Sequence, residues 1–400
     1  MGRTFLFISP QYPDRLRFLA NRLKLQGFTV VGIGDSDWGC LDEDLRGDLA
    51  EYCRVNMNCY KADGTIDPDV YAGIFNTACY LADKYGKPEY IESFNEWWLP
   101  LDAQLRSDMG VQGTQPDELQ HINRKSLMKE RFRAAEVNVV PGKLVDDLPG
   151  MVRFLTANGN DIIVKPDHGV GASDTYRIRS RAEAEIFFGR KRPSVQYFME
   201  KFIAGDDREL FSFDGITDES GSPAFFIAHH YCDGIMEVVG GGTLSYNNLK
   251  MNEIPEGLLR AGFASVKSFK IKKTFFHIEF FYSEGKFYGL EINARPPGVV
   301  TLDMDNHARG MDVWAAYAEI CDKGYTTARP TRDMICGYVS RLNEYKYRLP
   351  EVKDVLQAFR NEIVFDMKMD SRVMGDHCFL TLSDSQERCD ELRRAITELR

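Results

Sequence analysis

The stretch FFHIEFFYSEGKFYGLEINARPPG, residues 275–298, reads as a β-hairpin. Two runs rich in aromatic and β-branched residues flank the turn candidate Ser283-Glu284-Gly285-Lys286. If the hairpin folds about Gly285, Glu279 and Glu291 lie directly opposite each other, because each is six residues from Gly285. Opposed side chains in a strand pair have Cβ atoms about 4.5–5.5 Å apart. Two carboxylates so close repel each other unless a cation neutralises them, and hard oxygen ligands suit Mg²⁺.

One face of this predicted hairpin is polar and the other is apolar. Side chains alternate along a strand, so Asn293 and Arg295 share the face of Glu291. The opposite face carries apolar residues that we expect in the core, namely Phe276, Ile278, Phe280, Leu290 and Ile292. The alternative is an ordinary half-buried strand pair whose polar face is solvated and holds no metal.

Three lysines earlier in the chain are candidates for binding an anion. The spacing predicts a helix over 121–136 that carries Lys125 and, one turn later, the weaker candidate Lys129. Lys165 ends the predicted strand IIVK. A lysine in a buried strand is costly unless an anion pairs with it. A solvated surface charge is the alternative at each position.

A glycine-containing loop, Asp167-His168-Gly169-Val170-Gly171-Ala172-Ser173-Asp174, follows directly after Lys165-Pro166. Backbone N–H groups in such a loop can bind phosphate oxygens without obstruction by side chains. A Gly-x-Gly pattern alone is common in loops, but its position after a candidate phosphate lysine favours this role. His168 either touches substrate or caps the turn.

Glu279, the run Glu291-x-Asn293-x-Arg295 and these lysines together resemble the ATP-grasp superfamily. The resemblance extends over about residues 1–330. It implies that Glu279, Glu291 and Asn293 hold Mg²⁺, with Mn²⁺ as an alternative ion, against the phosphates of ATP.

The same resemblance assigns roles in phosphate binding and catalysis. It implies that Lys125 and Lys165 contact the nucleotide phosphates and that the loop closes over the triphosphate as a lid. Lys165 and Arg295 are then catalytic, with Arg295 steadying the transferred phosphoryl group. The loop residues assigned to ATP are Gly169, Gly171 and Ser173.

The run Phe198-Met199-Glu200-Lys201-Phe202-Ile203 resembles the strand that joins lid and body in these enzymes and binds adenine. The resemblance frames the base with Glu200, Lys201, Phe202 and Ile203. Glu209 matches the carboxylate that binds the ribose hydroxyls. Asp207 competes for this role, because the gap before Glu209 is longer than usual. The alternative is a surface strand of mixed charge.

The substrate site is expected around the turn that follows Arg295. In amino-acid ligases of the superfamily, a glycine-rich turn there offers backbone N–H groups to a carboxylate or an acyl-phosphate. Gly298 occupies this turn, and Val299 stands where similar sequences often have a second glycine. Asp303 follows at a predicted helix start. The predicted substrate contacts are therefore Arg295, Gly298 and Asp303.

Two further segments are candidates for bordering a substrate. The run FNEWW, residues 94–98, follows a predicted strand and is a candidate wall of the active-site cleft. Adjacent tryptophans, however, more often pack than recognise a ligand. The run Gly240-Gly241-Gly242 is either a substrate-facing loop or, slightly favoured, a flexible hairpin tip.

The order of predicted elements indicates a multidomain chain of α/β and α+β type. A strand, a helix and a second strand within residues 4–33 form a βαβ unit, which predicts a parallel sheet at the N-terminus. Residues 1–120 are predicted to form a parallel-sheet α/β domain of the kind that precedes ATP-grasp domains. Residues 121–330 are predicted to form the ATP-grasp domain, with a lid at about 142–200 and a mixed-sheet body at about 201–330. Residues 331–400 are predicted to form a small C-terminal α+β lobe.

The composition is that of a water-soluble globular protein. Of the 400 residues, 44% are hydrophobic and 28% are charged, and no apolar run approaches the roughly 18 residues of a membrane span. The net charge of −10 argues against nucleic acid as a main partner. The nine cysteines show no CxxC or metal-type spacing, which favours a reducing, cytoplasmic location.

We therefore expect an ATP-dependent carboxylate–amine ligase. The resemblance implies that a carboxylate is activated as an acyl-phosphate with release of ADP, and that an amine then displaces phosphate. Among the branches, L-amino-acid ligases look most similar because of the run Glu-Ile-Asn-Ala-Arg-Pro-Pro-Gly, so amino acids are the expected substrates. The alternatives are a bicarbonate-activating carboxylase or carbamoyl-phosphate-type enzyme, and a non-catalytic ATP-binding module. A homodimer is expected only by analogy with the superfamily.

Overall fold

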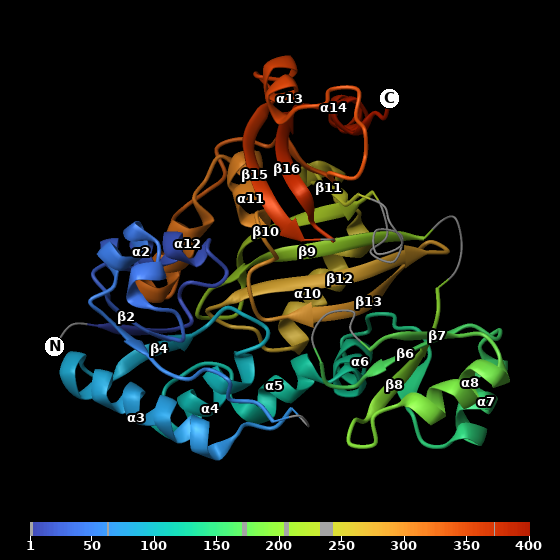
Figure 1. Cartoon of the computed structure of the whole chain (residues 1–400), viewed down its shortest axis with the longest axis horizontal. Coiled ribbons are helices and arrows are strands. Elements are labelled where there is room, and N and C mark those ends of the chain that lie inside the picture. The colour runs from blue at the N-terminus through green and yellow to red at the C-terminus, as the bar shows by residue number, and fades with distance from the viewer. Residues whose placement is uncertain (1–2, 62–63, 170–173, 204–207, 233–242, 372) are drawn as a thin grey trace.

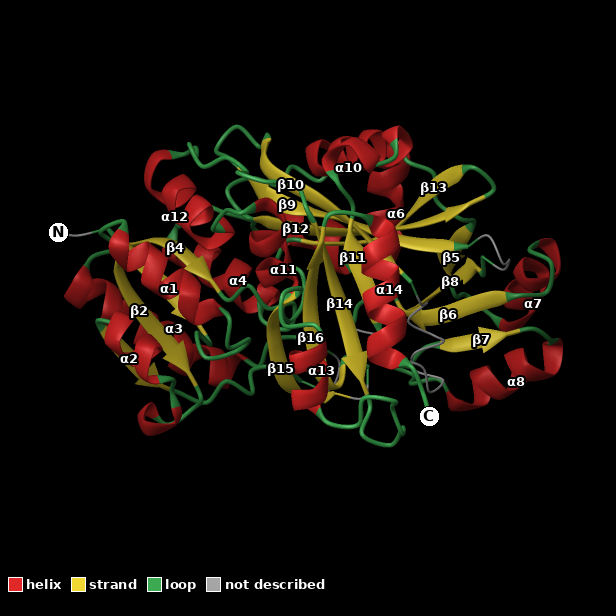
Figure 2. Cartoon of the chain, turned by 90° about the horizontal axis from the view of Figure 1, so that it is seen from above, coloured by secondary structure: helices red, strands yellow, loops and turns green. Residues whose placement is uncertain are grey.

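The strands of the chain form three sheets in a computed structural model that describes residues 3–61, 64–169, 174–203, 208–232, 243–371 and 373–400 (Figure 1). Seen from above, the N-terminal sheet and the sheet of residues 142–201 lie at opposite ends of the molecule, with a larger central sheet between them (Figure 2). The predicted combination of α/β and α+β architecture is confirmed. The domain boundaries proposed from the sequence stay predictions.

The N-terminal sheet is parallel and has the strand order β3-β2-β1-β4. Phe5 and Phe7 belong to a core with α1, whereas Leu6 and Ile8 belong to a core with α3. Helices therefore cover both faces, as a parallel sheet requires. The elements are β1 (Thr4–Ile8), α1 (Leu16–Leu25), β2 (Thr29–Gly34), α2 (Glu43–Asp48), β3 (Glu51–Arg54), α3 (Pro68–Tyr85), β4 (Pro88–Glu92) and α4 (Leu99–Met109).

The second sheet lies in the segment that was predicted to be the lid and has the order β5-β8-β6-β7. Two helices pack against it, and their apolar residues Met151 and Phe187 share a buried cluster with Val164 of the sheet. The elements are β5 (Gly142–Leu144), α7 (Leu148–Ala157), β6 (Ile162–Pro166), β7 (Tyr176–Ile178), α8 (Arg181–Arg190) and β8 (Tyr197–Lys201).

The central sheet has eight strands in the order β13-β12-β9-β10-β11-β14-β16-β15, and its neighbouring strands are antiparallel. Its C-terminal strands join through β14, which pairs with β11, so residues 331–400 extend the same sheet. A separate small core holds Val355 and Ile396 against that end of the sheet. The strands are β9 (Glu209–Thr217), β10 (Pro223–Tyr231), β11 (Ser245–Asn248), β12 (Phe275–Ser283), β13 (Lys286–Asn293), β14 (Ile335–Arg341), β15 (Ile363–Ser371) and β16 (Gly375–Ser383).

Helices cover both faces of the central sheet. Leu258 of α10 packs with Phe213 and Ile278 on one side, while Met304 of α11 and Tyr317 of α12 share the core that contains Phe275. The helices are α10 (Glu256–Ser268), α11 (Thr301–Arg309), α12 (Val313–Lys323), α13 (Val352–Ala358) and α14 (Gln386–Thr397). Within the described part of the chain, we find no helix whose length and apolarity would let it cross a membrane.

The single helix predicted over 121–136 is wrong, because two helices occupy this region. They are α5 (Pro116–Asn123) and α6 (Lys125–Ala134), and Arg124 between them is extended, with φ −106° and ψ 117°. The break is held from the lid, since the Asp167 carboxylate accepts hydrogen bonds from the Ser126 backbone N–H at 2.7 Å and from the Ser126 hydroxyl at 2.9 Å. A remote carboxylate at a helix start can thus end one helix and begin the next.

The hairpin of β12 and β13 has the predicted pairing of Glu279 with Glu291. The predicted turn Ser283-Glu284-Gly285-Lys286 is confirmed, with Glu284 and Gly285 at positive φ, 51° and 76°, as a two-residue connection. The hairpin is therefore centred between these two residues and not on Gly285. The pairing then shifts between Glu279 and Phe280, which brings the two glutamates back into register. The same irregularity leaves Leu290 half-buried, so its predicted place in the core is wrong.

Candidate active site

A buried ion cluster joins the lid to the helix after the N-terminal domain. Lys165 Nζ of β6 lies 2.6 Å from Glu200 Oε1 of β8, and Lys129 Nζ of α6 lies 3.4 Å from Glu200 Oε2. Burial alone would raise the pKa of Glu200, but Lys129 and Lys165 outweigh burial and lower it to about 2. Burial would likewise lower the pKa of Lys165, yet Glu200 and Glu291 outweigh it and raise that pKa. Glu200 and Lys165 therefore stay charged in the folded protein.

Lys125 lies at the first position of α6 and points to the lid loop. Its Nζ donates to the Gly169 carbonyl at 3.2 Å, and its backbone N–H donates to the Asp167 carbonyl at 2.8 Å. Burial lowers the pKa of Lys125, although Glu291 opposes this shift. A buried lysine at the start of a helix is a fitting partner for a phosphate oxygen.

The two hairpin carboxylates share one polar face with these lysines. Burial raises the pKa of Glu291, Lys125 lowers it, and Glu279 raises it again. Glu291 therefore interacts at once with the opposed Glu279 and with Lys125. The positive charge of Lys125 does not outweigh burial and the carboxylate of Glu279, and a divalent cation would add further positive charge.

Glu279, Glu291 and the buried amide of Asn293 are a donor set that fits Mg²⁺. In the described residues there is no group of three or more His, Cys, Asp or Glu side chains placed to hold a metal. The hairpin offers two carboxylates and one amide oxygen, which matches the way Mg²⁺ is bound by one or two carboxylates together with substrate phosphates and water. The metal role of these three residues stays a prediction.

Arg295 is held by a residue of the predicted cleft wall, in a pairing that the sequence did not predict. Its Nη2 donates to Glu96 Oε2 at 3.0 Å, and its Nη1 donates to the Pro296 carbonyl at 2.9 Å. Glu96 follows β4 of the N-terminal domain and belongs to the run 94–98 that the sequence marked as a candidate cleft wall. The ion pair brings the predicted catalytic arginine to that wall.

A cavity of about 670 Å³ opens beside this ion pair. Glu96 and Trp97 of the N-terminal domain line it, together with Asp167 and His168 of the lid loop and Glu291 of the hairpin. Three separate parts of the chain thus close on one space, which is of the size that small-molecule sites have. Trp97 lines the cavity, so the sequence-based candidate wall is in place.

The predicted adenine strand makes contacts of several kinds. The Glu200 side chain forms ion pairs with lysines. Lys201 is exposed, and its backbone N–H donates to the Pro141 carbonyl at 2.9 Å. The Arg177 guanidinium carbon lies over the Phe202 ring, 3.7 Å from the ring centroid. The Ile203 carbonyl accepts a hydrogen bond from Arg208 at 3.2 Å. Glu209 Oε2 lies 2.9 Å from His230 Nε2. The roles of Glu200, Lys201, Phe202, Ile203 and Glu209 in nucleotide binding stay predictions.

Some predicted residues lie outside the described part of the chain. They are Gly171 and Ser173 of the lid loop, Asp207 beside the ribose candidate, and the run Gly240-Gly241-Gly242.

The turn after Arg295 contains the other predicted substrate contacts. Gly298 is exposed, and its carbonyl accepts from the Thr301 hydroxyl at 2.7 Å. Val299 has φ 53°, a left-handed conformation that a β-branched residue rarely adopts and that favours glycine. Asp303 points elsewhere than the cavity, since its Oδ2 lies 3.1 Å from Arg15 Nε and it is absent from the cavity's described lining. Its substrate role stays a prediction.

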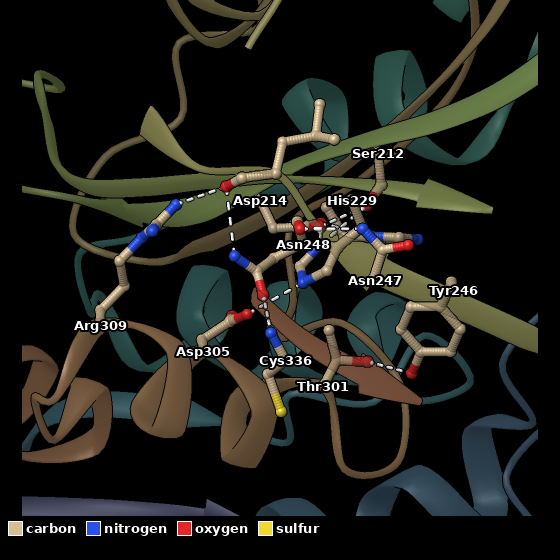
Figure 3. Close-up of polar contacts among 12 residues, drawn as sticks. Ser212, Asp214, His229, Tyr246, Asn247, Asn248, Thr301, Asp305, Arg309 and Cys336 are labelled. Atoms are coloured by element: carbon tan, nitrogen blue, oxygen red, sulfur yellow. Dashed lines mark hydrogen bonds and ion pairs between the residues drawn. The ribbon is translucent and has the colours of Figure 1, made fainter. Parts of the chain in front are cut away.

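A chain of buried charged groups runs inward from Glu279, and the sequence analysis missed it. His277 Nε2 lies 3.3 Å from Glu279 Oε1, and His277 Nδ1 lies 2.5 Å from Asp214 Oδ1. Asp214 Oδ2 lies 2.8 Å from His229 Nδ1, and His229 Nε2 lies 3.0 Å from Asp305 Oδ1 (Figure 3). The only signal in the sequence is that His277 shares the face of Glu279, two residues away.

The charges along this chain alternate. Burial alone would lower the pKa of both histidines. For His277, the effect of Asp214 outweighs burial and raises the pKa to about 10. For His229, the effects of Asp305 and Asp214 outweigh burial and raise the pKa to about 9. Burial would raise the pKa of Asp214, but His277 and His229 hold it well below its usual range. Both imidazoles are therefore charged at neutral pH, each beside a carboxylate.

A second set of polar contacts ties α11 to the sheet around this chain (Figure 3). The Asn248 side chain accepts from the Cys336 backbone N–H at 2.6 Å and donates to the Leu249 carbonyl at 3.2 Å. Arg309 donates to that same carbonyl at 2.7 Å. Arg309 is the last residue of α11, so its bond ties the C-terminal end of this helix to the sheet.

The stability of the protein is expected to fall as pH rises from about 6.5 to 9. A histidine whose pKa is raised on folding stabilises the fold fully below its unfolded value near 6.5, and this contribution is lost as pH passes its folded value of about 9. For His229 the loss is about 3 kcal/mol at most. Urea unfolding at several pH values checks this: His229→Gln should flatten the decline. His377→Gln is the matched control, since His377 pairs with Asp366 at 2.9 Å in a half-buried position. An unchanged slope in His229→Gln would contradict the assignment.

Comparison with known proteins identifies the fold. No protein-family model matches the chain, and no curated protein sequence matches it. Among solved structures, the L-amino acid ligase from Bacillus licheniformis superposes with a TM-score of 0.72 at 13% identity, covering 98% of this chain and 96% of that one. N5-carboxyaminoimidazole synthetase from Staphylococcus aureus gives a TM-score of 0.72 at 14% identity, covering 99% and 98%.

A third structure is the biotin carboxylase domain of 2-oxoglutarate carboxylase from Hydrogenobacter thermophilus, in complex with MgADP, ADP and bicarbonate. Its TM-score is 0.70 at 14% identity, and the match covers 100% of this chain and 90% of that one. The matches span nearly the whole of each chain, and the sequence identities are low, so what is shared is the fold. This chain has the ATP-grasp fold, as the resemblance of its hairpin and lysines predicted.

Proposed function

We propose that the protein is an ATP-dependent ligase that activates a carboxylate as an acyl-phosphate and joins it to an amine. The observation that carries the proposal is that a single cavity is lined by Glu291 of the hairpin and by Glu96, the partner of Arg295, while Lys125 and Lys165 interact with Glu291. The fold neighbours that form carbon–nitrogen bonds or are solved with MgADP support it. The expected cofactors are ATP and Mg²⁺, with Mn²⁺ as an alternative ion.

The proposed reaction has two balanced steps. An oxygen of the substrate carboxylate attacks the γ-phosphorus of ATP, and the bond from that phosphorus to the bridging oxygen breaks, so that ADP leaves. The nitrogen of a neutral amine then attacks the acyl carbon, the bond to the phosphate oxygen breaks, and the nitrogen loses a proton. The products are an amide, ADP and inorganic phosphate. Mg²⁺ held by the hairpin would neutralise charge on the transferring group.

The side chains of the cluster suit these steps. Lys125 is buried and the Lys165 side chain is only 14% exposed, and both would hold phosphate oxygens. Arg295 has a planar guanidinium that can hold the transferred phosphoryl group and the oxyanion that forms when the amine attacks. Its present partner, Glu96, would have to share Arg295 with the substrate.

A bicarbonate-activating carboxylase is the second candidate. The structure from Hydrogenobacter thermophilus, solved with bicarbonate, superposes about as well as the amino acid ligase does. The carboxylase would use the same phosphate site but would need only a small pocket for its acid. The cavity of about 670 Å³ favours a larger acid. Cytoplasmic location and a homodimer remain part of the proposal.

The test of function is release of ADP and phosphate with Mg-ATP against amino acids and small carboxylates, singly and in pairs, with mass detection of products. Release that needs a pair and yields the mass of both minus water would establish an amide ligase. Release with bicarbonate alone would favour the carboxylase. No release with any acid, despite ATP binding, would contradict both and leave a binding module.

Replacing Lys165 by alanine is expected to lower kcat/KM for ATP by at least about tenfold. The change removes a buried cation next to the phosphate site and leaves Glu200 with one lysine instead of two. Steady-state ADP release at varied ATP checks this. Lys143→Ala is the control, because Lys143 lies in the same sheet but pairs with Asp146 at the surface. A variant with the wild-type KM and kcat would show that Lys165 has no role in nucleotide binding.

A further inference from the structure

The ion pair of Glu96 and Arg295 has the charge pattern of a site for an amino acid. Glu96 lines the cavity, and its Oε2 lies 3.0 Å from Arg295 Nη2, so an anionic and a cationic group stand side by side. Both side chains keep about a fifth of their surface exposed, at 18% and 20%. An α-amino acid carries an ammonium and a carboxylate on adjacent atoms. Binding between the two residues would exchange one ion pair for two.

Glu96 is the carboxylate of the cavity that is available for an ammonium group. Three carboxylates occur among the described lining residues, namely Glu96, Asp167 and Glu291. Asp167 already accepts bonds from Arg124 and Ser126 and holds the start of α6. Glu291 faces Glu279 on the predicted metal face. Among the described lining residues, Glu96 is therefore the carboxylate best placed to pair with a cationic substrate group.

The wall next to Glu96 is aromatic and apolar. The ring of Trp97 meets Tyr60 edge to face, with centroids 5.4 Å apart, and 51% of Trp97 is exposed. The Trp97 backbone N–H donates to the Asn95 side chain at 3.0 Å, which fixes the turn that presents both Glu96 and Trp97. Leu119 and Ile66 continue this wall. Such a wall gains free energy by covering a large apolar side chain.

We propose that the cavity binds an α-amino acid with a large apolar side chain as the acid that is activated. Its ammonium pairs with Glu96, its carboxylate lies against Arg295 beside Glu291, and its side chain covers Trp97 and Tyr60. This inference rests on the proposed ligase function and adds the class of the acid. It also gives Glu96 a role in specificity, while Arg295 acts on the reacting carboxylate.

The test uses hydroxylamine as a common amine, so that only the acid varies. The enzyme would form the acyl-phosphate, hydroxylamine would displace phosphate, and the hydroxamate would be measured. Three acids separate the features: L-phenylalanine, 3-phenylpropanoate, which lacks the ammonium group, and L-alanine, which lacks the ring. L-Phenylalanine is expected to exceed each of the others in kcat/KM by at least about tenfold.

Two variants with matched controls assign the selectivity to residues. Glu96→Gln should bring L-phenylalanine and 3-phenylpropanoate within about threefold of each other, because the ion pair to the ammonium is lost. Trp97→Ala should bring L-phenylalanine and L-alanine closer by a similar factor. The controls are Glu89→Gln, which loses a surface ion pair with Arg3, and Trp38→Ala, which removes a tryptophan that is 47% exposed away from the cavity. Both controls should keep the wild-type preferences.

Each adverse outcome points to a different error. Equal use of 3-phenylpropanoate, or an unchanged preference in Glu96→Gln, would overturn the ammonium site. A preference for alanine or for charged amino acids would overturn the apolar wall. No hydroxamate from any carboxylate, with ATP still bound, would overturn the ligase function itself and the inference with it.

Discussion

Replacing Glu291 by glutamine is expected to reduce ADP release by at least about 100-fold while the fold survives. The change keeps the shape of the side chain but removes one of the two opposed carboxylates of the hairpin. Changes in the shell around a metal ligand alone cost roughly 10–100-fold in affinity or activity, and loss of a ligand should exceed that. The measurement is ADP release at varied Mg²⁺, together with far-UV circular dichroism and thermal unfolding.

The Glu291→Gln variant should also need more Mg²⁺ to reach half its remaining rate. Glu284→Gln is the matched control, because Glu284 lies exposed at the turn of the same hairpin. Burial and the opposed Glu279 both raise the pKa of Glu291, so the substitution removes an unfavourable buried charge in the metal-free protein. Without Mg²⁺, the thermal unfolding temperature of Glu291→Gln should therefore be no lower than that of the wild type. Unaltered turnover in Glu291→Gln would refute the metal assignment.

Replacing Asp214 by asparagine is expected to destabilise the protein by about 3–5 kcal/mol, the cost of removing one partner from a buried ion pair. Asp214 is fully buried and is shared by His277 and His229, which both have pKa values raised well above the ordinary one. A neutral amide cannot balance two buried imidazolium groups. The free energy of unfolding in urea at pH 7 measures the loss.

Asp366→Asn provides the matched control for Asp214→Asn. Asp366 of β15 pairs with His377 at 2.9 Å, but its side chain is 34% exposed. Solvent can replace that partner, so the control should lose only about 0–1 kcal/mol. A similar loss of unfolding free energy in both variants would contradict the expectation that a buried ion pair costs more to break than an exposed one. Asp214→Asn should also raise the Mg²⁺ requirement, because His277 would no longer be held against Glu279.

The hairpin could be predicted from sequence because its signals are local. Alternation of apolar and polar residues sets the faces of β12 and β13, and a glycine sets the turn. The pairing of Glu279 with Glu291 followed from counting residues and is confirmed. The prediction assumed a hairpin centred on Gly285, whereas the turn is centred between Glu284 and Gly285. The shift in register between Glu279 and Phe280 offsets this difference, so Glu279 still pairs with Glu291.

The break between α5 and α6 could not be predicted in the same way. Nothing at Arg124 itself forbids a helix, since arginine is a good helix former. The break depends on Asp167, which is 43 residues away from Arg124 and binds the start of α6. The result is that Lys125 lies at a helix start rather than inside a helix, which suits a residue expected to bind phosphate.

The pairing of Glu96 with Arg295 and the chain of His277, Asp214, His229 and Asp305 were missed for a related reason. Each of these groups is a single charged residue in an ordinary local pattern. Their meaning comes from partners on other elements, as with Arg295 for Glu96 and α11 for His229. Burying a single charge costs free energy unless a group of opposite charge lies beside it.

The sequence by itself determined the class of the fold and the polar face of the hairpin, because both depend on short-range periodicity and on the spacing of residues within single elements. The candidate metal and phosphate residues came from the resemblance to the ATP-grasp superfamily and stay predictions. The tertiary structure alone decided which charges meet, where the helix after the N-terminal domain begins, and that the C-terminal strands complete the central sheet. Such contacts join residues far apart in the chain, and their free energy depends on distance and burial, which no local pattern records.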